Sequence, residues 1–216
     1  VHKGILQNDM TMEPQTIELP TQGAGGLVYY GAPADPLVVQ YRGVAPDYEG
    51  FVRVIDTGFQ YDDDAGMVSY NDPTIVSNAM IDECHRPIHQ VRHDDKIAIF
   101  CDGAFDADPP VNTTIYVVDE TMTSNEEQSS AIVQTVTLQG AHHGVAVPVD
   151  DGHLLHSVAL PERILRDPNV TSLPSTFQVI GLDGSIVHEM SDVTNPNTHC
   201  AGFHGSASIQ NTFFLA

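Results

Sequence analysis

Phe51-Val52-Arg53-Val54-Ile55-Asp56 is the stretch that decides the fold, because two later segments repeat its pattern. They are Ile115-Tyr116-Val117-Val118-Asp119 and Phe177-Gln178-Val179-Ile180-Gly181-Leu182-Asp183. Each is a run rich in β-branched and aromatic residues that ends in aspartate before a turn, and the terminal aspartates are 63 and 64 residues apart. Such runs predict β-strands, and the Asp183-Gly184 pair supports a hairpin turn.

A second repeated pattern interleaves with the first and consists of hairpins that each open with a histidine. The histidines are His89, His143 and His204, spaced 54 and 61 residues apart. Each leads through a polar turn into a second strand, at residues 96–100, 153–158 and 212–216. Helical periodicity is nearly absent, so the fold class is all-β. Repeats of this length, made of short antiparallel strands, predict a β-propeller of consecutive four-stranded antiparallel blades.

The repeat also bears on domain organisation. About three and a half units fit in the chain, which is few for a closed ring. We therefore expect residues 1–216 to form a single β-propeller domain that is an incomplete ring in this chain. Blades before residue 1 and strands after residue 216 are expected to complete it.

The charge balance excludes several classes of partner. Twenty-nine acidic residues face eight Lys and Arg, which gives a formal net charge of −21. No basic patch is available to neutralise phosphates, so nucleic acid and anionic lipid are excluded as partners. No apolar run approaches the roughly 20 residues of a membrane-spanning helix. The surface suits cations or basic partners, and adaptation to a saline habitat is the alternative explanation.

The recurring histidines predict a metal site. The first strand of a propeller blade lines the central channel, so His89, His143 and His204 at matching positions would converge near one mouth. Neutral imidazole is the commonest metal ligand, and three imidazoles with a carboxylate or water satisfy tetrahedral zinc. Each histidine taken alone would more often be a structural residue. Second-tier candidates for the same site are His142, His85 and Asp102.

Neighbouring histidines cannot both serve this site from a regular strand. Adjacent strand residues point to opposite faces, so one of His142 and His143 faces the channel. We predict His143, because the glycine after it aligns with the glycine after His204. Asp102 is expected to complete the coordination shell or to orient an imidazole.

The cysteines and sequons point to an extracytoplasmic location, either periplasmic or secreted. Cys84 and Cys101 flank one predicted hairpin, and a disulfide between them would require an oxidising compartment. Two buried thiols, or a metal cluster that uses Cys84 and His85, are the alternatives. Asn112 and Asn169 head N-x-S/T sequons and are glycosylation candidates in a eukaryotic secretory route.

Enzymatic motifs are lacking. The sequence contains no G-x-S-x-G elbow, no H-E-x-x-H and no P-loop, so we expect a protein that is not an enzyme. A propeller enzyme with a metal-activated water is a remaining alternative, and it would need an open metal position with a nearby base.

Several of these segments resemble the periplasmic zinc metallochaperone family AztD over roughly residues 51–216. The more specific matches are the runs from Gly140-Ala141-His142-His143-Gly144 to Pro148 and from His199-Cys200 to Ser208. Arg86-Pro87-Ile88-His89-Gln90-Val91-Arg92-His93, Phe100-Cys101-Asp102-Gly103 and Val54-Ile55-Asp56-Thr57-Gly58 resemble the family as well.

The resemblance implies a β-propeller that binds zinc and passes it to the solute-binding protein of a zinc importer. It also implies a disulfide between Cys200 and a residue just beyond position 216. Two features depart from the family. Its His/Asp-rich metal-capturing loop is replaced by the histidine-free run 59–67. After the His204-Gly205 pair, Ser206 stands where the family has an acidic residue. An alternative function is therefore a secreted acidic propeller that serves as a structural or interaction module in an extracellular assembly, with any metal structural.

Overall fold

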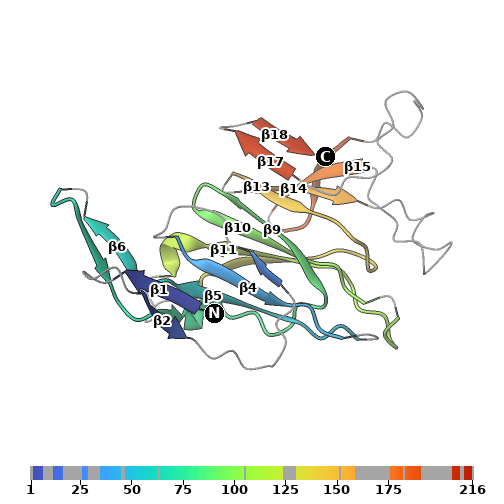
Figure 1. Ribbon diagram of the computed structural model, residues 1–216. Helices are drawn as coiled ribbons and strands as arrows, with labels where there is room; N and C mark the ends of the chain where they lie inside the picture. The colour runs from blue at the N-terminus through green and yellow to red at the C-terminus, as the bar shows by residue number, and fades with distance from the viewer. Residues whose placement is uncertain are drawn as a thin grey trace.

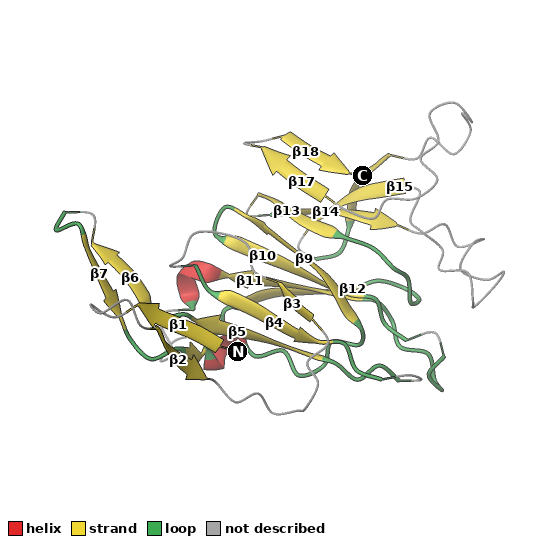
Figure 2. Ribbon diagram, in the orientation of Figure 1, coloured by secondary structure: helices red, strands yellow, loops and turns green. Residues whose placement is uncertain are grey.

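The protein is described from a computed structural model (Figure 1), in which the strands form antiparallel sheets. The residues that it describes are 2–6, 12–16, 26–28, 35–44, 47–62, 64–104, 106–123, 130–150, 152–158, 176–181, 183–190, 206–209 and 212–215. Figure 2 shows how strands dominate this part of the chain, and the described helices are the short 3₁₀ turns η1 (Ser77–Ala79) and η2 (Glu120–Met122).

The strand bounds follow the sequence repeats closely. The strands are β1 (His2–Leu6), β2 (Met12–Thr16), β3 (Gly26–Val28), β4 (Leu37–Tyr41), β5 (Phe51–Asp56), β6 (Phe59–Asp62), β7 (Met67–Tyr70), β8 (Thr74–Ile75), β9 (Pro87–His93), β10 (Lys96–Cys101), β11 (Thr114–Asp119), β12 (Ile132–Thr137), β13 (Ala146–Asp150), β14 (His153–Val158), β15 (Thr176–Gly181), β16 (Ile186–Met190), β17 (Ser206–Ile209) and β18 (Thr212–Leu215).

Three of the described sheets have four strands, in the orders β3-β4-β5-β8, β9-β10-β11-β12 and β13-β14-β15-β16. The repeated aspartate-ended runs become β5, β11 and β15, which is the third strand of each sheet. The histidine hairpins supply the first two strands of the second and third sheets, and β17 pairs with β18 as the next hairpin. The predicted all-β class and the antiparallel four-stranded units are confirmed, and no closed ring is present among these strands.

The sheets lie side by side in chain order (Figure 1), with the β9–β12 sheet in the middle. Strand β10 explains this position, because five of its six residues are buried. Side chains alternate across a strand, so Ile97 and Ile99 face one neighbour while Phe100 faces the other. A strand that is covered on both faces has an apolar run instead of the alternation of a half-exposed strand.

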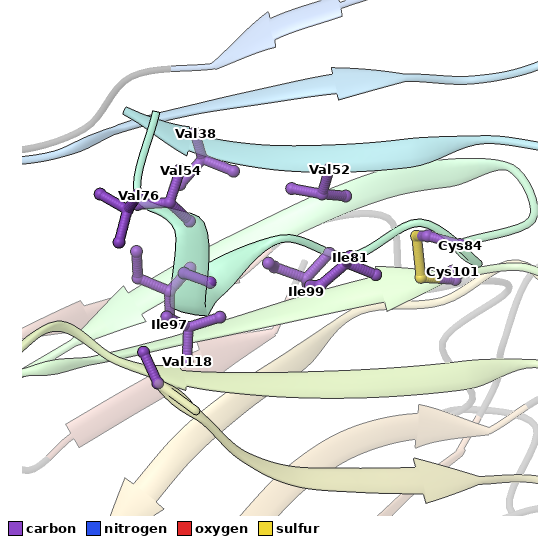
Figure 3. Close-up of a cluster of buried hydrophobic side chains, with 12 residues drawn as sticks. Val38, Val52, Val54, Val76, Ile81, Cys84, Ile97, Ile99, Cys101 and Val118 are labelled. Atoms are coloured by element: carbon purple, nitrogen blue, oxygen red, sulfur yellow. A yellow bond between two sulfur atoms is a disulfide. The ribbon is translucent and has the colours of Figure 1, made fainter. Parts of the chain in front are cut away.

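We name the contact between the β3–β8 sheet and the β9–β12 sheet the first interface. Its core is apolar (Figure 3) and includes Val52 and Val54 from β5 packed against Ile97 and Ile99. The disulfide Cys84–Cys101 lies at one end of this cluster. The predicted disulfide is therefore confirmed, and the thiol and Cys84–His85 metal-cluster alternatives are wrong, because both sulfurs are bonded to each other.

We name the contact between the β9–β12 sheet and the β13–β16 sheet the second interface. Its apolar core contains Phe100, Ile115, Leu154 and Ile180. Strand β13 packs beside both β9 and β10, which brings the start of the third sheet against the end of β10. This end of the second interface contains the histidines considered below.

Two other predicted features have a defined place. The histidine-free run after Gly58 forms the β6–β7 hairpin, whose turn residues 64–66 are exposed and which projects from the sheets (Figure 2). Asn112 is exposed, and its side-chain oxygen accepts a hydrogen bond of 3.0 Å from the Gly140 amide. Asn169 and Cys200 lie outside the described residues.

Candidate metal site

His89 is the third residue of β9, and it pairs with Phe100 of the neighbouring strand β10 in antiparallel register. The side chain is half-buried at the edge of the second interface. Because β9 is the first strand of its sheet and packs beside β13, His89 lies on the side where the third sheet begins.

His143 comes from the irregular segment 141–145, which crosses from the second sheet to the third. Backbone hydrogen bonds fix this segment: the amide of His142 donates to the Asp102 carbonyl at 3.0 Å, and the amide of Val145 donates to the Ser157 hydroxyl at 2.8 Å. Gly144 fits where no side chain could, since an added Cβ would lie 2.7 Å from the Phe100 ring and 2.8 Å from the Ser157 hydroxyl oxygen. The His-Gly motif therefore reflects a close approach of the backbone to the second core.

Asp102 follows β10 directly and fixes the orientation of His143. The carboxylate is 1% exposed, and its Oδ2 lies 2.9 Å from His143 Nδ1. A carboxylate only accepts hydrogen bonds, so His143 donates through Nδ1–H and directs the lone pair of Nε2 away from Asp102. Burial raises the pKa of Asp102, and the neighbouring His143 and Arg86 oppose that increase.

The two imidazoles meet through their Nε2 atoms, which are 3.3 Å apart, with ring centroids separated by 5.1 Å. Because Nε2 of His143 is an acceptor, His89 donates through Nε2–H in the metal-free protein. Tetrahedral zinc with Zn–N bonds of 2.0–2.1 Å places two ligand nitrogens about 3.3 Å apart. The pair therefore has the spacing of two zinc ligands, with a carboxylate behind one of them as in carboxylate–histidine–zinc triads.

His142 makes different contacts from His143. It is 3% exposed, its ring packs edge-on against Phe100, and Nδ1 lies 3.3 Å from the Thr113 hydroxyl. His156 is similarly buried on β14, with Nδ1 donating to the Ser157 carbonyl at 3.2 Å. Burial is the largest cause that lowers the pKa of His142, and also that of His156, to about 4. Both imidazoles are therefore neutral at pH 7.

The structure thus brings His89, His143 and Asp102 together, and His142 lies against the same segment without facing His89. The imidazole of His85 contacts a different residue, since its Nδ1 is 2.7 Å from the Asp47 carbonyl oxygen. His204 lies outside the described residues. Within the described part of the chain, no group of three or more His, Cys, Asp or Glu side chains is arranged to hold a metal ion.

Thr113 and Arg86 belong to this site but carried no local signal in the sequence. The Thr113 hydroxyl donates to the Asp102 carbonyl at 2.8 Å and accepts from the His142 amide at 2.9 Å. Arg86 Nε lies 3.9 Å from the Asp102 carboxylate. Both contacts join residues that are distant in sequence, so only the fold reveals them.

Comparison with solved structures identifies similar folds. AztD from Citrobacter koseri superposes with a TM-score of 0.64 and 20% sequence identity, over 96% of this chain and 47% of that chain. A structure of apo AztD from the same organism gives a TM-score of 0.63 and 21% identity over the same shares. The chain therefore spans about half the length of the AztD chains it matches, and the predicted AztD-like fold is confirmed.

No protein-family model matches the sequence, and a search of the curated proteins gave no match. Among the described residues, no helix has the length and apolar character needed to cross a membrane.

Proposed function

We propose that this chain belongs to an extracytoplasmic β-propeller that binds zinc through His89, His143 and His204 and delivers it to a transport partner. The 3.3 Å separation of the two Nε2 atoms is the observation that carries this proposal. A hydrogen-bonded structural histidine needs one suitable neighbour. Two imidazole rings whose Nε2 atoms face each other, with a buried carboxylate on the Nδ1 side of one ring, instead suit a shared cation.

His204 is proposed as the third ligand because it opens the next histidine hairpin, ahead of β17 and β18. In the propeller that we propose, β9, β13 and β17 are the first strands of consecutive blades. A carboxylate or water would complete a four-coordinate shell. The net charge of −21 would favour a cation near this surface.

The delivery role rests on the resemblance to the AztD family and on the similar fold. That resemblance implies a periplasmic protein whose partner is the solute-binding protein of a zinc importer. The β6–β7 hairpin contains no histidine, so capture and transfer through this region would differ from the family pattern. No hydrolytic role is proposed.

A matched pair of alanine variants tests the metal site. His143→Ala removes a proposed ligand, whereas His153→Ala removes a partly exposed histidine that is bonded to Asp150 near the hairpin turn. The metal-stripped protein would be titrated with zinc against a chromophoric chelator. We expect the first variant to lose at least about 100-fold in affinity, since even supporting residues of a metal site contribute 10–100-fold, and the second to match the unmodified protein.

Equal affinities for the unmodified protein and His143→Ala, with both folded, would refute the site. Zinc that binds at one equivalent but does not exchange with a competing chelator within hours would favour the structural-module alternative, because closed shells are typical of structural sites. Adding the purified solute-binding protein of a zinc importer and measuring zinc on each protein after separation tests delivery directly.

A further inference from the structure

We propose that Arg86 is a positioning residue for the metal site, acting through Asp102 to fix the orientation and tautomer of His143. This inference rests on the proposed function for its purpose, but its geometry stands independently. Arg86 lies in the loop before β9, one residue from the strand that carries His89.

The backbone of Arg86 is held in an unusual conformation by three contacts. Its φ is +55°, a left-handed value that is uncommon for residues other than glycine. The amide donates to the Tyr48 carbonyl at 3.0 Å, and the carbonyl accepts from the Asp102 amide at 3.2 Å. The guanidinium lies over the Tyr48 ring at 5.0 Å from its centroid. These contacts hold the side chain against the residue that orients His143.

The side chain is directed at one carboxylate oxygen. Arg86 Nε lies 3.9 Å from Asp102 Oδ2, the same oxygen that accepts from His143 Nδ1. Arg86 Nε and Asp102 Oδ1 are both buried and have no hydrogen-bond partner among the described residues. A buried donor and a buried acceptor without partners cost free energy, so their retention calls for an explanation. The guanidinium and the imidazole therefore both face Oδ2 of Asp102.

Electrostatics explain how Arg86 would orient Asp102. A carboxylate that is 1% exposed has almost no water to orient it, so nearby positive charge determines how it lies. Arg86 is the near cation, whereas Arg42, which also acts on Asp102, is exposed and therefore screened. Without Arg86 we expect the carboxylate to turn and its hydrogen bond to His143 to weaken. His143 would then populate the Nε2–H tautomer, in which Nε2 has no lone pair for a metal beside His89.

The disulfide supports the same arrangement. Cys84 lies two residues before Arg86, and Cys101 immediately precedes Asp102, so the bond ties the arginine loop to the end of β10. A second backbone contact, from the Gly103 amide to the His85 carbonyl at 3.0 Å, repeats this connection. The loop that carries Arg86 is thus attached to the end of β10, directly before Asp102.

Four variants at two positions test the role. Arg86→Gln removes the charge, Arg86→Met removes it while keeping the aliphatic stem over Tyr48, Arg86→Lys keeps a charge, and Arg42→Gln removes an exposed charge as the control. Two readouts are taken on each folded protein at pH 7.5: zinc affinity by chelator competition, and the ¹⁵N chemical shifts of the His143 ring nitrogens without metal.

We expect Arg86→Gln and Arg86→Met to weaken zinc binding about 10–100-fold, the range for residues that orient metal ligands. Their ring shifts should move from the single Nδ1–H form toward a mixture of tautomers. Arg86→Lys should restore most of both values, and Arg42→Gln should leave both unchanged. Should Arg86→Gln fail to fold, Arg86→Met decides, because it keeps the packing.

Unchanged ring shifts in both neutral variants would overturn the inference, whatever happens to affinity, because a merely structural arginine would not select a tautomer. Equal effects of Arg42→Gln and Arg86→Gln would overturn it as well. If the unmodified protein binds no zinc but the ring shifts still respond to Arg86, the positioning role stands and the proposed function fails. The two failures are therefore distinguishable.

Discussion

The first and second interfaces bury opposite faces of the same central sheet, yet they contain different chemistry. The core cluster of the first interface consists of apolar side chains and the Cys84–Cys101 bond, and the buried amide of Gln40 donates to the Ile88 carbonyl at 3.2 Å across it. The second interface pairs an apolar core with buried polar groups at one end, among them Asp102, His142 and His156. The same strand, β10, supplies residues to both.

The difference indicates a division of labour between the two contacts. Apolar burial stabilises a fold by about 25 cal/mol per Å² and needs no particular partner, which suits the first interface. Buried polar groups contribute little net stability and require precise geometry, which suits a site. We therefore expect changes in the first interface to alter folding stability, and changes beside the polar end of the second to alter metal binding as well.

The largest expected effect comes from a matched pair of core truncations. Ile99→Ala opens a cavity in the first interface and Ile115→Ala opens one in the second, and both side chains are fully buried. Each should lower the free energy of unfolding by about 2–5 kcal/mol, measured by urea denaturation. Only Ile115→Ala should also weaken zinc binding, because Ile115 pairs with Phe100, which packs on His142 and Gly144.

Zinc affinity of the folded fraction is the measurement that separates the two variants. Equal losses of affinity would show that the interfaces are coupled as one body and would remove the proposed division. Ile99→Val, which deletes one methylene, serves as the mild control and should cost about 0.5–1.5 kcal/mol with unchanged affinity.

A somewhat smaller effect is expected from the disulfide at one end of the first interface. Replacing both Cys84 and Cys101 by alanine opens a loop with a sequence separation of 17 residues. Closing a loop of about that length stabilises a fold by about 3 kcal/mol through the unfolded state. We expect that loss in urea denaturation of the double variant, and a similar loss on reducing the unmodified protein with a dithiol.

Reduction of the double variant is the control, since it lacks the Cys84–Cys101 bond, and any further change would come from Cys200. A loss below about 1 kcal/mol would mean that the packing around the two sulfurs, and not the covalent link, stabilises this end of the first interface.

Much of the fold could be predicted from repeats in the sequence. The aspartate-ended runs at Asp56, Asp119 and Asp183 mark the same strand or its turn in each four-stranded sheet, because a two-residue side-chain period and turn residues are local properties. Cys84 and Cys101 could be paired for a similar reason, since each flanks one hairpin.

The site was less accessible from the sequence, because its contacts join segments far apart in the chain. His89 and His143 were expected to occupy matching strand positions. His89 lies within β9, whereas His143 precedes β13 by three residues, and the two meet only because 141–145 crosses between sheets. The contact of Arg86 with Asp102 depends on a left-handed backbone at Arg86, and no sequence pattern indicates such a conformation for arginine. His204, outside the described residues, stays a prediction.

An effect of similar size is a pH dependence from His156 in the second interface. Burial lowers the pKa of His156 to about 4, against an unfolded value near 6.5. As the pH falls, the His156 imidazole is protonated in the unfolded chain before it is protonated in the folded protein. The contribution of His156 to the free energy of unfolding is therefore constant above pH 6.5 and falls between pH 6.5 and 4. The loss approaches about 3 kcal/mol near pH 4, at 1.36 kcal/mol per pH unit.

His156→Gln removes this titration but keeps a polar side chain, so its stability should fall less over the same interval. Asp102 acts in the opposite direction, because its raised pKa favours proton uptake by the folded protein at low pH. It is present in both proteins, as is His142, so the difference between their urea-denaturation curves at pH 7 and pH 4.5 isolates His156. Parallel curves would mean that water reaches His156 in the folded protein. The second interface would then be open to water at its polar end, in contrast to the apolar core of the first interface.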